Sequence, residues 1–414
     1  MQVVVVADHA HINGGQAKVS IESAIGLAGG GHEVTYFAAV GPVDPRLEPA
    51  GVKVVCLGQG DIETSGKLAF LAQTLWNGAS RARLAEVIAG LDSARSVVHV
   101  HAWAKALSPS IGAALREAKC GRVYTMHEFF LVCPNGGFYD YPRAEPCHRA
   151  PMSLSCVTTN CDARSYARKV ARLARHELLR FGGLADAFSH VITISDLQYR
   201  VSRDYVAPGV EWCRVDNPID ATDPGPRSGI GEDFLFVGRV STEKGIAHFC
   251  EAARRAGVTA TIAGDGPLMG ELRQKYPDAR FLGWKSPAEL GDIMRAARAL
   301  VFPSVWYEGQ PLTVYEALAR GAPVVVSDAC AGREAVVDGE NGFWFKSADA
   351  DSLAAALRKL KDDATAARMS ENAWRRYWSA PLTMARHLDA TEDVYARALA
   401  AARRRDGIAD GSRS

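Results

Sequence analysis

The sequence predicts an α/β protein built from two doubly wound, parallel-sheet domains. Buried strand-like runs, such as QVVVVAD at the start and APVVVSD in the second half, alternate with helical segments along the whole chain. The 414 residues exceed what one core usually supports, and a polar stretch rich in proline and glycine lies at residues 221–233. We therefore expect an N-terminal domain at 1–218, a second domain at 219–380, C-terminal helices at 381–404 that pack back on the first domain, and a disordered tail at 405–414.

The composition is that of an ordinary globular enzyme. Hydrophobic residues make up 48% of the chain, charged residues 23%, and the formal net charge is +1, which argues against a nucleic-acid partner. The apolar run near the N-terminus is too short for a signal peptide, and no stretch approaches the roughly 18 to 20 apolar residues of a membrane span. Nine cysteines, an odd number, favour a reducing compartment. We expect a cytoplasmic protein.

The first strand leads into a glycine pair, Gly14 and Gly15, that opens a helix. The stretch GGQAK differs from the dinucleotide fingerprint GxGxxG, and no acidic residue closes the following strand. The pair is therefore either a tight turn or a place where backbone amides contact a phosphate.

Three histidines, His99, His101 and His127, stand at or near the ends of predicted strands. A lone histidine there is most often a packed or hydrogen-bonded residue. His127 is the strongest functional candidate, because open α/β sheets bind their ligands at strand ends.

Residues 129–162 break the alternation and form a loop-like excursion that contains Cys133, Cys147, Cys156 and Cys161. Four thiols within 29 residues match the ligand chemistry of a structural zinc ion. The spacing is loose and no CxxC pair is present, so free thiols or a disulfide remain alternatives to zinc.

A basic helix is predicted to follow at 163–181. Its cations either cover a solvated face or form a docking surface for an anionic membrane or a phosphate-bearing acceptor. The cations concerned are Arg164, Arg168, Lys169, Arg172, Arg175 and Arg180.

In the second half, groups suited to a diphosphate follow successive strands. Arg239 and Lys244 share the loop GRVSTEKG, and Gly264 and Gly266 follow the next strand, where backbone can approach a ligand closely. Two cations together with free helix amides can hold a pyrophosphate.

The stretch from Leu300 to Phe345 predicts a strand, a loop, a helix and a second strand. Glu308 lies in the loop and Glu316 early in the helix, with seven residues between them, and Pro311 is expected at the first helical position. The free N–H groups near Leu312 and Thr313 predict an anion site beside two hydroxyl-binding acids. The pair Asp349 and Asp351 precedes a later helix and is better explained by N-caps than by a metal site.

These motifs resemble a known family. GRVSTEKG, AGDGP, FLGW and PSVWYEGQPLTVYEALARGAPVVVSD are similar to the C-terminal half of family 4 glycosyltransferases (glycosyl transferases group 1). Those are retaining enzymes of the GT-B fold, in which two Rossmann-like domains face each other across a cleft. The looser resemblance of the first half includes NPID at 217–220, where NGID is more usual.

The resemblance implies a site that binds a nucleoside-diphosphate sugar. Arg239 and Lys244 would bind the diphosphate, Glu316 the ribose and Glu308 the transferred sugar. Gly15 would offer its amide to the phosphate, and His127 would contact the sugar. The implied catalytic residues are Glu308, His127, Arg239 and Lys244, and the implied donor-binding residues are Gly14, Gly15, Arg239, Lys244, Gly264, Gly266, Gln310, Pro311, Leu312, Thr313 and Glu316.

The resemblance further implies a metal-independent hexosyltransferase. The donor would be a UDP- or GDP-sugar, the acceptor a lipid-linked or polysaccharide chain, and the attack would come from the front face. A GT-B phosphorylase, a nucleotide-sugar epimerase and a non-catalytic nucleotide-sugar-binding subunit are the alternatives. The four intact residues Glu308, Glu316, Arg239 and Lys244 argue against a subunit that has lost its chemistry.

Overall fold

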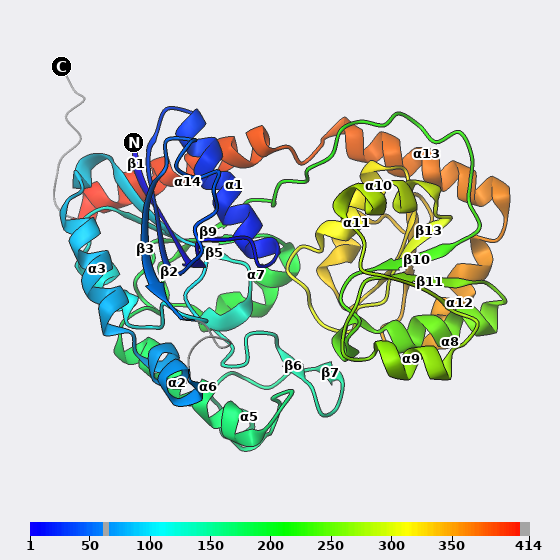
Figure 1. Ribbon diagram of the computed structural model, residues 1–414, viewed down its shortest axis with the longest axis horizontal. Helices are drawn as coiled ribbons and strands as arrows, with labels where there is room; N and C mark the ends of the chain where they lie inside the picture. The colour runs from blue at the N-terminus through cyan, green and yellow to red at the C-terminus, as the bar shows by residue number, and fades with distance from the viewer. Residues whose placement is uncertain (61–65, 406–414) are drawn as a thin grey trace. The chain divides into compact units, whose positions relative to one another are not determined.

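The computed structural model describes residues 1–60 and 66–405, and the tail predicted as disordered lies almost wholly outside them. The chain forms two compact units (Figure 1). The first unit comprises Met1–Gly136, Arg149–Pro218 and the segment that begins at Met384. The second comprises Gly137–His148 and Ile219–Thr383.

The first unit contains a seven-stranded sheet in which every neighbouring pair of strands is parallel. The order β3-β2-β1-β4-β5-β8-β9 places β1 near the middle. The order reverses direction between β1 and β4, which is where an open parallel sheet binds its ligands. The strands are β1 (Gln2–His9), β2 (Glu33–Val40), β3 (Lys53–Gln59), β4 (Ser96–Val100), β5 (Gly121–Met126), β8 (His190–Thr193) and β9 (Glu211–Arg214).

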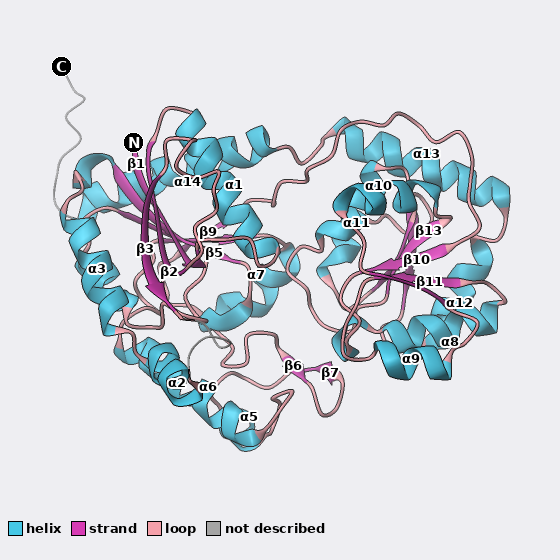
Figure 2. Ribbon diagram, viewed as in Figure 1, coloured by secondary structure: helices cyan, strands magenta, loops and turns pink. Residues whose placement is uncertain are grey.

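Helices and short 3-10 turns connect these strands (Figure 2). They start where the sequence supplies caps: the Ser195 side chain accepts a hydrogen bond from the Gln198 amide at the start of α7. The elements are α1 (Gly15–Gly29), α2 (Lys67–Leu75), α3 (Gly78–Ala89), η1 (Ser93–Arg95), α4 (Ile111–Glu117), η2 (Phe129–Leu131), α5 (Leu154–Thr158), α6 (Tyr166–Phe181), α7 (Asp196–Ser202) and η3 (Arg203–Tyr205).

The last helix, α14 (Met384–Arg405), belongs to the first unit although it follows the second unit in sequence. Its residues Val394, Tyr395 and Ala398 lie in the same buried core as Val3 and Val5 of β1. The Tyr395 hydroxyl also lies 2.7 Å from Nδ1 of His99 on β4. The helix therefore completes one face of the first sheet.

The second unit contains a six-stranded parallel sheet in the order β12-β11-β10-β13-β14-β15. Its order reverses between β10 and β13, so the loops that follow these two strands are neighbours. The strands are β10 (Phe234–Val237), β11 (Ala260–Ala263), β12 (Arg280–Gly283), β13 (Ala299–Phe302), β14 (Val324–Ser327) and β15 (Gly342–Phe345).

Both faces of this sheet are covered by helices, as the near-continuous apolar strands require. Successive side chains point to opposite faces: Phe234 and Phe236 lie in one buried core, Leu235 and Val237 in the other. The helices and turns are η4 (Thr242–Lys244), α8 (Ile246–Ala256), α9 (Met269–Lys275), α10 (Pro287–Ala296), α11 (Leu312–Ala319), η5 (Ala331–Ala335), α12 (Ala350–Lys359) and α13 (Asp363–Ser379).

Two helices of the second unit start close to where the sequence predicts, at Asp349 and Pro311. Asp349 is the N-cap of α12, and its Oδ1 accepts hydrogen bonds from the Asp351 and Ser352 amides, so the N-cap explanation of this acidic pair is confirmed. Pro311 is the N-cap of α11 and not its first helical residue, because its ψ of 101° is extended. The helix begins one residue later than predicted.

The Cys-rich excursion divides between the units. Residues Gly137–His148 belong to the second unit and contain a small antiparallel pair of strands, β6 (Tyr139–Asp140) and β7 (Glu145–Pro146). Tyr139 packs edge to face against Trp306, and the Tyr307 hydroxyl lies 3.3 Å from Nδ1 of His148. The assignment of the whole excursion 129–162 to the N-terminal domain is therefore wrong for this hairpin, because its aromatic partners lie in the loop after β13.

None of the helices within residues 1–60 and 66–405 combines enough length with enough apolar character to span a bilayer.

Candidate active site

A short charged network lies at the carboxyl ends of the central strands of the second unit. Lys244 of η4 donates from Nζ to Oε1 of Glu308 at 2.6 Å, and Ser304 donates from Oγ to the same oxygen at 2.6 Å. The two side chains of the ion pair are 20% and 10% exposed, so the pair is shielded but reachable from one side. All hydrogen bonds to Glu308 within the described residues go to Oε1, which leaves Oε2 for a ligand hydroxyl.

The backbone of Glu308 is strained. Glu308 has a φ of 45°, in the left-handed region that residues other than glycine rarely adopt. Such strain persists where the surroundings hold it, and it is common at functional sites. Here the Lys244 and Ser304 hydrogen bonds hold the carboxylate, and Ser304 also donates to the backbone oxygen of Glu243 at 3.3 Å.

Lys244 is further placed by aromatic rings and by a close backbone approach. Its Nζ lies 5.4 Å from the ring centre of Trp306 and 5.9 Å from that of Phe302. The next residue, Gly245, has a φ of 68°, and a Cβ there would lie 2.0 Å from the Pro303 oxygen. The loops after β10 and β13 therefore touch through a glycine that no larger residue can replace without movement.

At Gly264 and Gly266, as at Gly245, neighbouring backbone leaves no room for a side chain. A Cβ at Gly264 would lie 1.9 Å from the Gly238 oxygen, and one at Gly266 would lie 2.4 Å from the Val240 oxygen. Their N–H groups donate within the chain, to the Gly283 oxygen at 2.8 Å and to Oδ1 of Asp265 at 2.7 Å. These residues shape the edge of the site, and their contact with a donor stays a prediction.

The remaining predicted residues of the second unit line the same strand ends. Arg239 lies in the loop directly after β10 with an exposed side chain, and its guanidinium has no ion-pair partner among the described residues. Leu312 and Thr313 form the first turn of α11, and Glu316 lies one turn further, half-buried. Gln310 and Pro311, just before the helix, are buried, and Pro311 packs against Gly332.

In the first unit, the predicted residues lie at the carboxyl ends of β1 and β5. Gly14 and Gly15 are exposed at the start of α1, and the helix has no acidic residue in its first turn, so its free amides suit an anion. Nε2 of His127 lies 3.0 Å from Nδ1 of His101, and the Gln16 amide donates to the His101 oxygen at 2.5 Å. Burial lowers the pKa of His127 to about 3, so its imidazole is neutral at physiological pH.

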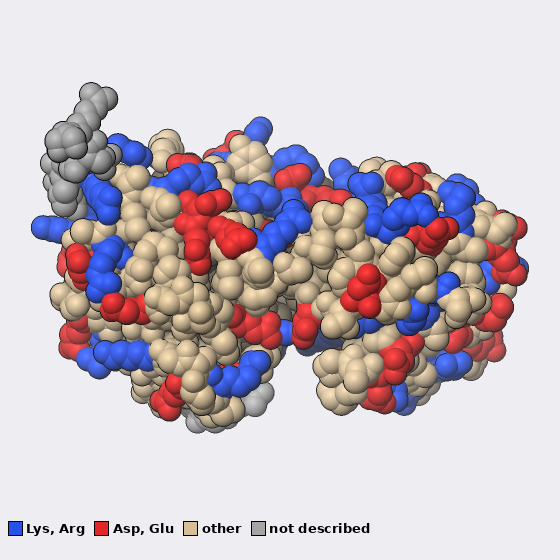
Figure 3. Space-filling model, turned by 90° about the horizontal axis from the view of Figure 1, so that it is seen from above, with Lys and Arg blue, Asp and Glu red and all other residues tan. Residues whose placement is uncertain are grey.

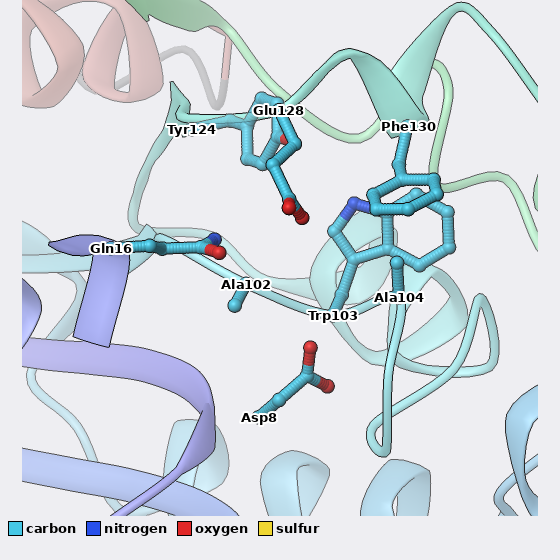
Figure 4. A pocket seen from close by; sticks show the side chains of 8 residues that line it. All are labelled: Asp8, Gln16, Ala102, Trp103, Ala104, Tyr124, Glu128 and Phe130. Atoms are coloured by element: carbon cyan, nitrogen blue, oxygen red, sulfur yellow. The ribbon is translucent and has the colours of Figure 1, made fainter. Parts of the chain in front are cut away.

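A small pocket adjoins this histidine pair (Figure 4). Gln16 and Glu128 direct polar groups into it, and Trp103 and Phe130 contribute aromatic rings to its lining. Asp8 lies below and accepts hydrogen bonds from the backbone amides of residues 105–107, which fixes the neighbouring loop.

The other histidine, His99, has a structural role. Its ring nitrogens lie 2.7 Å from the Tyr395 hydroxyl and 2.7 Å from Oγ1 of Thr125. Both nitrogens are therefore occupied within the core. Sequence reasoning missed Ser304, Gln16 and the His101 contact, since each depends on which loops meet in space.

The structure does not group the four cysteines for which the sequence offered zinc, free thiols or a disulfide as metal ligands. No group of three or more metal-ligating side chains occurs among the described residues, and none of the four cysteines forms a disulfide. Cys147 lies in the hairpin of the second unit, whereas the other three belong to the first. The Lys169 ammonium lies between the sulfurs of Cys156 and Cys161, in the position that a cation would need.

The basic helix α6 directs three of its five lysine and arginine side chains inward. Lys169 is buried, Arg172 pairs with Asp162 at 3.1 Å, and Arg175 donates to the Ala104 and Pro134 oxygens. Arg175 also stacks over Phe130, with its guanidinium carbon 4.7 Å from the ring centre. Only Arg164, Arg168 and Arg180 of the predicted docking surface are exposed.

Surface charge in the view of Figure 3 is mixed in sign, with Lys and Arg interspersed among Asp and Glu. This distribution agrees with the net charge of +1 and shows no extended field of one sign on that face.

Residues 227–376 match the family model described as glycosyl transferases group 1. The chain is 28% identical over 397 residues to a glycogen synthase of Mycobacterium tuberculosis, which covers 89% of this chain and 87% of that protein. The sucrose-phosphate synthase structure from Thermosynechococcus elongatus has a TM-score of 0.69 at 19% identity, covering 97% of this chain and 99% of that one. Anabaena Alr3699/HepE in complex with UDP has a TM-score of 0.65 at 17% identity, covering 96% and 100%.

The matched region contains the Lys244 and Glu308 network and the first turn of α11. The fold likeness extends over both parallel-sheet units. The chain is therefore a glycosyltransferase with the GT-B fold.

Proposed function

We propose that this chain is a retaining glycosyltransferase of the family 4 type. It moves a hexose from a nucleoside-diphosphate sugar to a lipid-linked or polysaccharide acceptor. The observation that carries the proposal is the pairing of Lys244 with Glu308 at the two neighbouring strand ends of the second unit. A cation for the diphosphate and an acid for the sugar hydroxyls are thereby held beside each other.

The roles follow from charge and position. Arg239 has an exposed guanidinium suited to a diphosphate, and Lys244 neutralises the charge that develops on the leaving group. Oε2 of Glu308 accepts from a sugar hydroxyl, and Glu316 accepts from the ribose hydroxyls. Residues 310–313 place backbone amides at the start of α11 for the phosphates.

The first unit supplies two further groups in this proposal. The free amides at Gly14 and Gly15 contact the donor phosphate, as exposed amides at a helix start can. His127 contacts the transferred sugar as a neutral imidazole, because burial lowers its pKa and His101 fixes its Nε2.

The reaction proceeds by attack on the face of the sugar from which the diphosphate departs. The acceptor oxygen forms a bond to the anomeric carbon while the bond from that carbon to the phosphate oxygen breaks. The acceptor proton passes to the departing phosphate oxygen, so no protein base is required. Arg239, Lys244 and the α11 amides stabilise the departing charge, each well-placed donor contributing about 3 kcal/mol.

Donor binding is tested by thermal stabilisation with UDP-, GDP-, ADP- and dTDP-sugars. A ligand at 100 times its dissociation constant is expected to add about 2.7 kcal/mol to the free energy of unfolding. We expect UDP- or GDP-sugars to raise the Tm and the others to leave it unchanged. No shift with any donor would contradict the proposal.

Assays of product formation distinguish the proposed transferase from the alternative activities. Sugar release that depends on inorganic phosphate would indicate a phosphorylase, and interconversion of the donor without an acceptor would indicate an epimerase. Binding without turnover over many acceptors would indicate a non-catalytic subunit. Formation of a glycosylated acceptor supports the proposed transferase.

We also propose that α6 docks on an anionic membrane surface. Its exposed side carries Tyr166, Val170 and Phe181, which are 42%, 48% and 80% exposed, and Leu154 of α5 is 81% exposed. Arg168 and Arg180 of the same helix are exposed as well and supply positive charge. Lys169, Arg172 and Arg175 of α6 point inward, so they are not part of this proposed docking surface.

The protein is expected to sediment with anionic vesicles at low salt and to be released at high salt, because exposed charges are screened. Arg168→Glu combined with Arg180→Glu should abolish sedimentation, whereas Arg375→Glu on α13 of the second unit should not. Equal binding to neutral and anionic vesicles would contradict the docking role.

A further inference from the structure

A buried ammonium lies between two thiols in the first unit. Lys169 is 1% exposed, and its Nζ lies 3.3 Å from Sγ of Cys161 and 3.5 Å from Sγ of Cys156. The two cysteines are themselves 6% and 9% exposed. Within the described residues, these sulfurs are the only hydrogen-bond partners of Nζ. The arrangement brings a primary amine and two thiols to one point.

The neighbouring acid does not neutralise this cation. Asp162 is paired with Arg172, whose Nε lies 3.1 Å from Oδ2. A buried charge requires a compensating charge or strong hydrogen bonds. Although burial disfavours the ammonium, the sulfurs of Cys161 and Cys156 hold the pKa of Lys169 above its usual value. The two sulfurs are therefore the groups that compensate the buried ammonium.

We propose that Cys161 and Lys169 form an oxidant-dependent covalent link between Sγ and Nζ, making this pair a reversible modification site. Cys161 is the reacting thiol because its sulfur is the nearer of the two to Nζ. The link joins the loop before α6 to α6 itself.

The chemistry uses a peroxide as the oxidant. The Cys161 thiolate attacks one peroxide oxygen and becomes a sulfenic acid, while the other oxygen leaves as hydroxide and takes a proton from the ammonium to form water. The freed amine attacks the sulfur, the S–N bond forms, and the sulfenic hydroxyl leaves with an amine proton as a second water. Thiolate, ammonium and one peroxide thus give the link and two waters.

Electrostatics favours this product over the alternative disulfide. A bond between Cys156 and Cys161 would remove both thiol partners and leave a buried ammonium without compensation, which is costly. The S–N link removes the thiolate and the ammonium together. A free thiol attacks the sulfur of the link and returns both residues to their reduced form.

The link would act on the loop that follows His127. The Cys161 oxygen accepts from Nδ2 of Asn135 at 2.9 Å, and Arg172 of α6 donates to the Asn135 oxygen at 3.2 Å. The segment after η2 is therefore already attached to Cys161 and to α6, the helix that carries Lys169. Oxidation would fix this attachment covalently.

The experiment treats the folded protein with hydrogen peroxide, then unfolds and alkylates it, and digests it with trypsin without a reductant. We expect peptide 150–164, which contains both cysteines, joined to peptide 169–172, and we expect dithiothreitol to separate them. Cys161→Ser, which keeps a hydrogen-bond acceptor, should abolish the link. Cys156→Ser should retain it.

Two controls keep the outcome clear. Lys169→Arg keeps the cation but removes the primary amine, so no link should form. Cys250 of α8, a buried thiol in the second unit, should be alkylated normally in the same digest. A disulfide within peptide 150–164, oxidised cysteine without a link, or a link that persists in Cys161→Ser would each overturn the proposal.

Discussion

Glu308→Gln is expected to lower kcat for sugar transfer by about 10²-fold or more while the protein stays folded. The amide keeps the shape of the side chain but removes the charge that pairs with Lys244 and accepts from the sugar. Steady-state kinetics with the preferred donor, together with a thermal melt, measures the change. Turnover near that of the wild type would show that Glu308 does not act on the sugar.

A matched control exists on the surface of the second unit. Glu371 of α13 pairs with Arg375 one turn away, and both side chains are exposed. Exposed ion pairs contribute about 0–1 kcal/mol, so Glu371→Gln should leave kcat and Tm nearly unchanged. Loss of activity in both variants would indicate a general effect of removing a carboxylate.

Lys244→Met is expected to lower kcat by about 10²–10³-fold, because it removes a cation aimed at the leaving diphosphate. The methionine retains an apolar stem against Phe302 and Trp306, whose rings the lysine now contacts. Lys244→Arg should restore part of the rate by returning the charge. Kinetics of the three proteins at saturating donor measure this difference, and a wild-type kcat for Lys244→Met would exclude the role.

The double variant tests whether the two residues act together. Lys244 and Glu308 share one hydrogen bond, so their effects should be strongly non-additive. We expect Lys244→Met combined with Glu308→Gln to be little slower than the worse single variant. Fully additive losses would show that the two groups act at separate places.

The alternation of strands and helices was predictable because its signals are local. The apolar runs at β1 and β14 are buried on both faces, as parallel strands require. Gly321, with a φ of 71°, ends the helix α11 as its position after a periodic segment predicts. Turn chemistry and periodicity determine such elements without knowledge of the tertiary contacts.

The orientation of α6 and the fate of the thiols could not be predicted in this way. The sequence shows six cations on one helix but not which side packs, and Lys169 is buried because the excursion folds over it. Thiol spacing alone does not show that an ammonium lies between two sulfurs. The partners of Glu308 and His127 likewise lie on separate loops, and only the sheet order brings those loops together.

Stereochemistry of the product tests the central claim most directly. Wild-type protein is mixed with an α-configured nucleotide sugar and an oligosaccharide acceptor, and proton NMR follows the anomeric signals from the first turnovers. The account predicts loss of the donor signal, release of the nucleoside diphosphate and a new α-linked anomeric proton. A β-linked product, or no consumption of any UDP- or GDP-sugar, would contradict it.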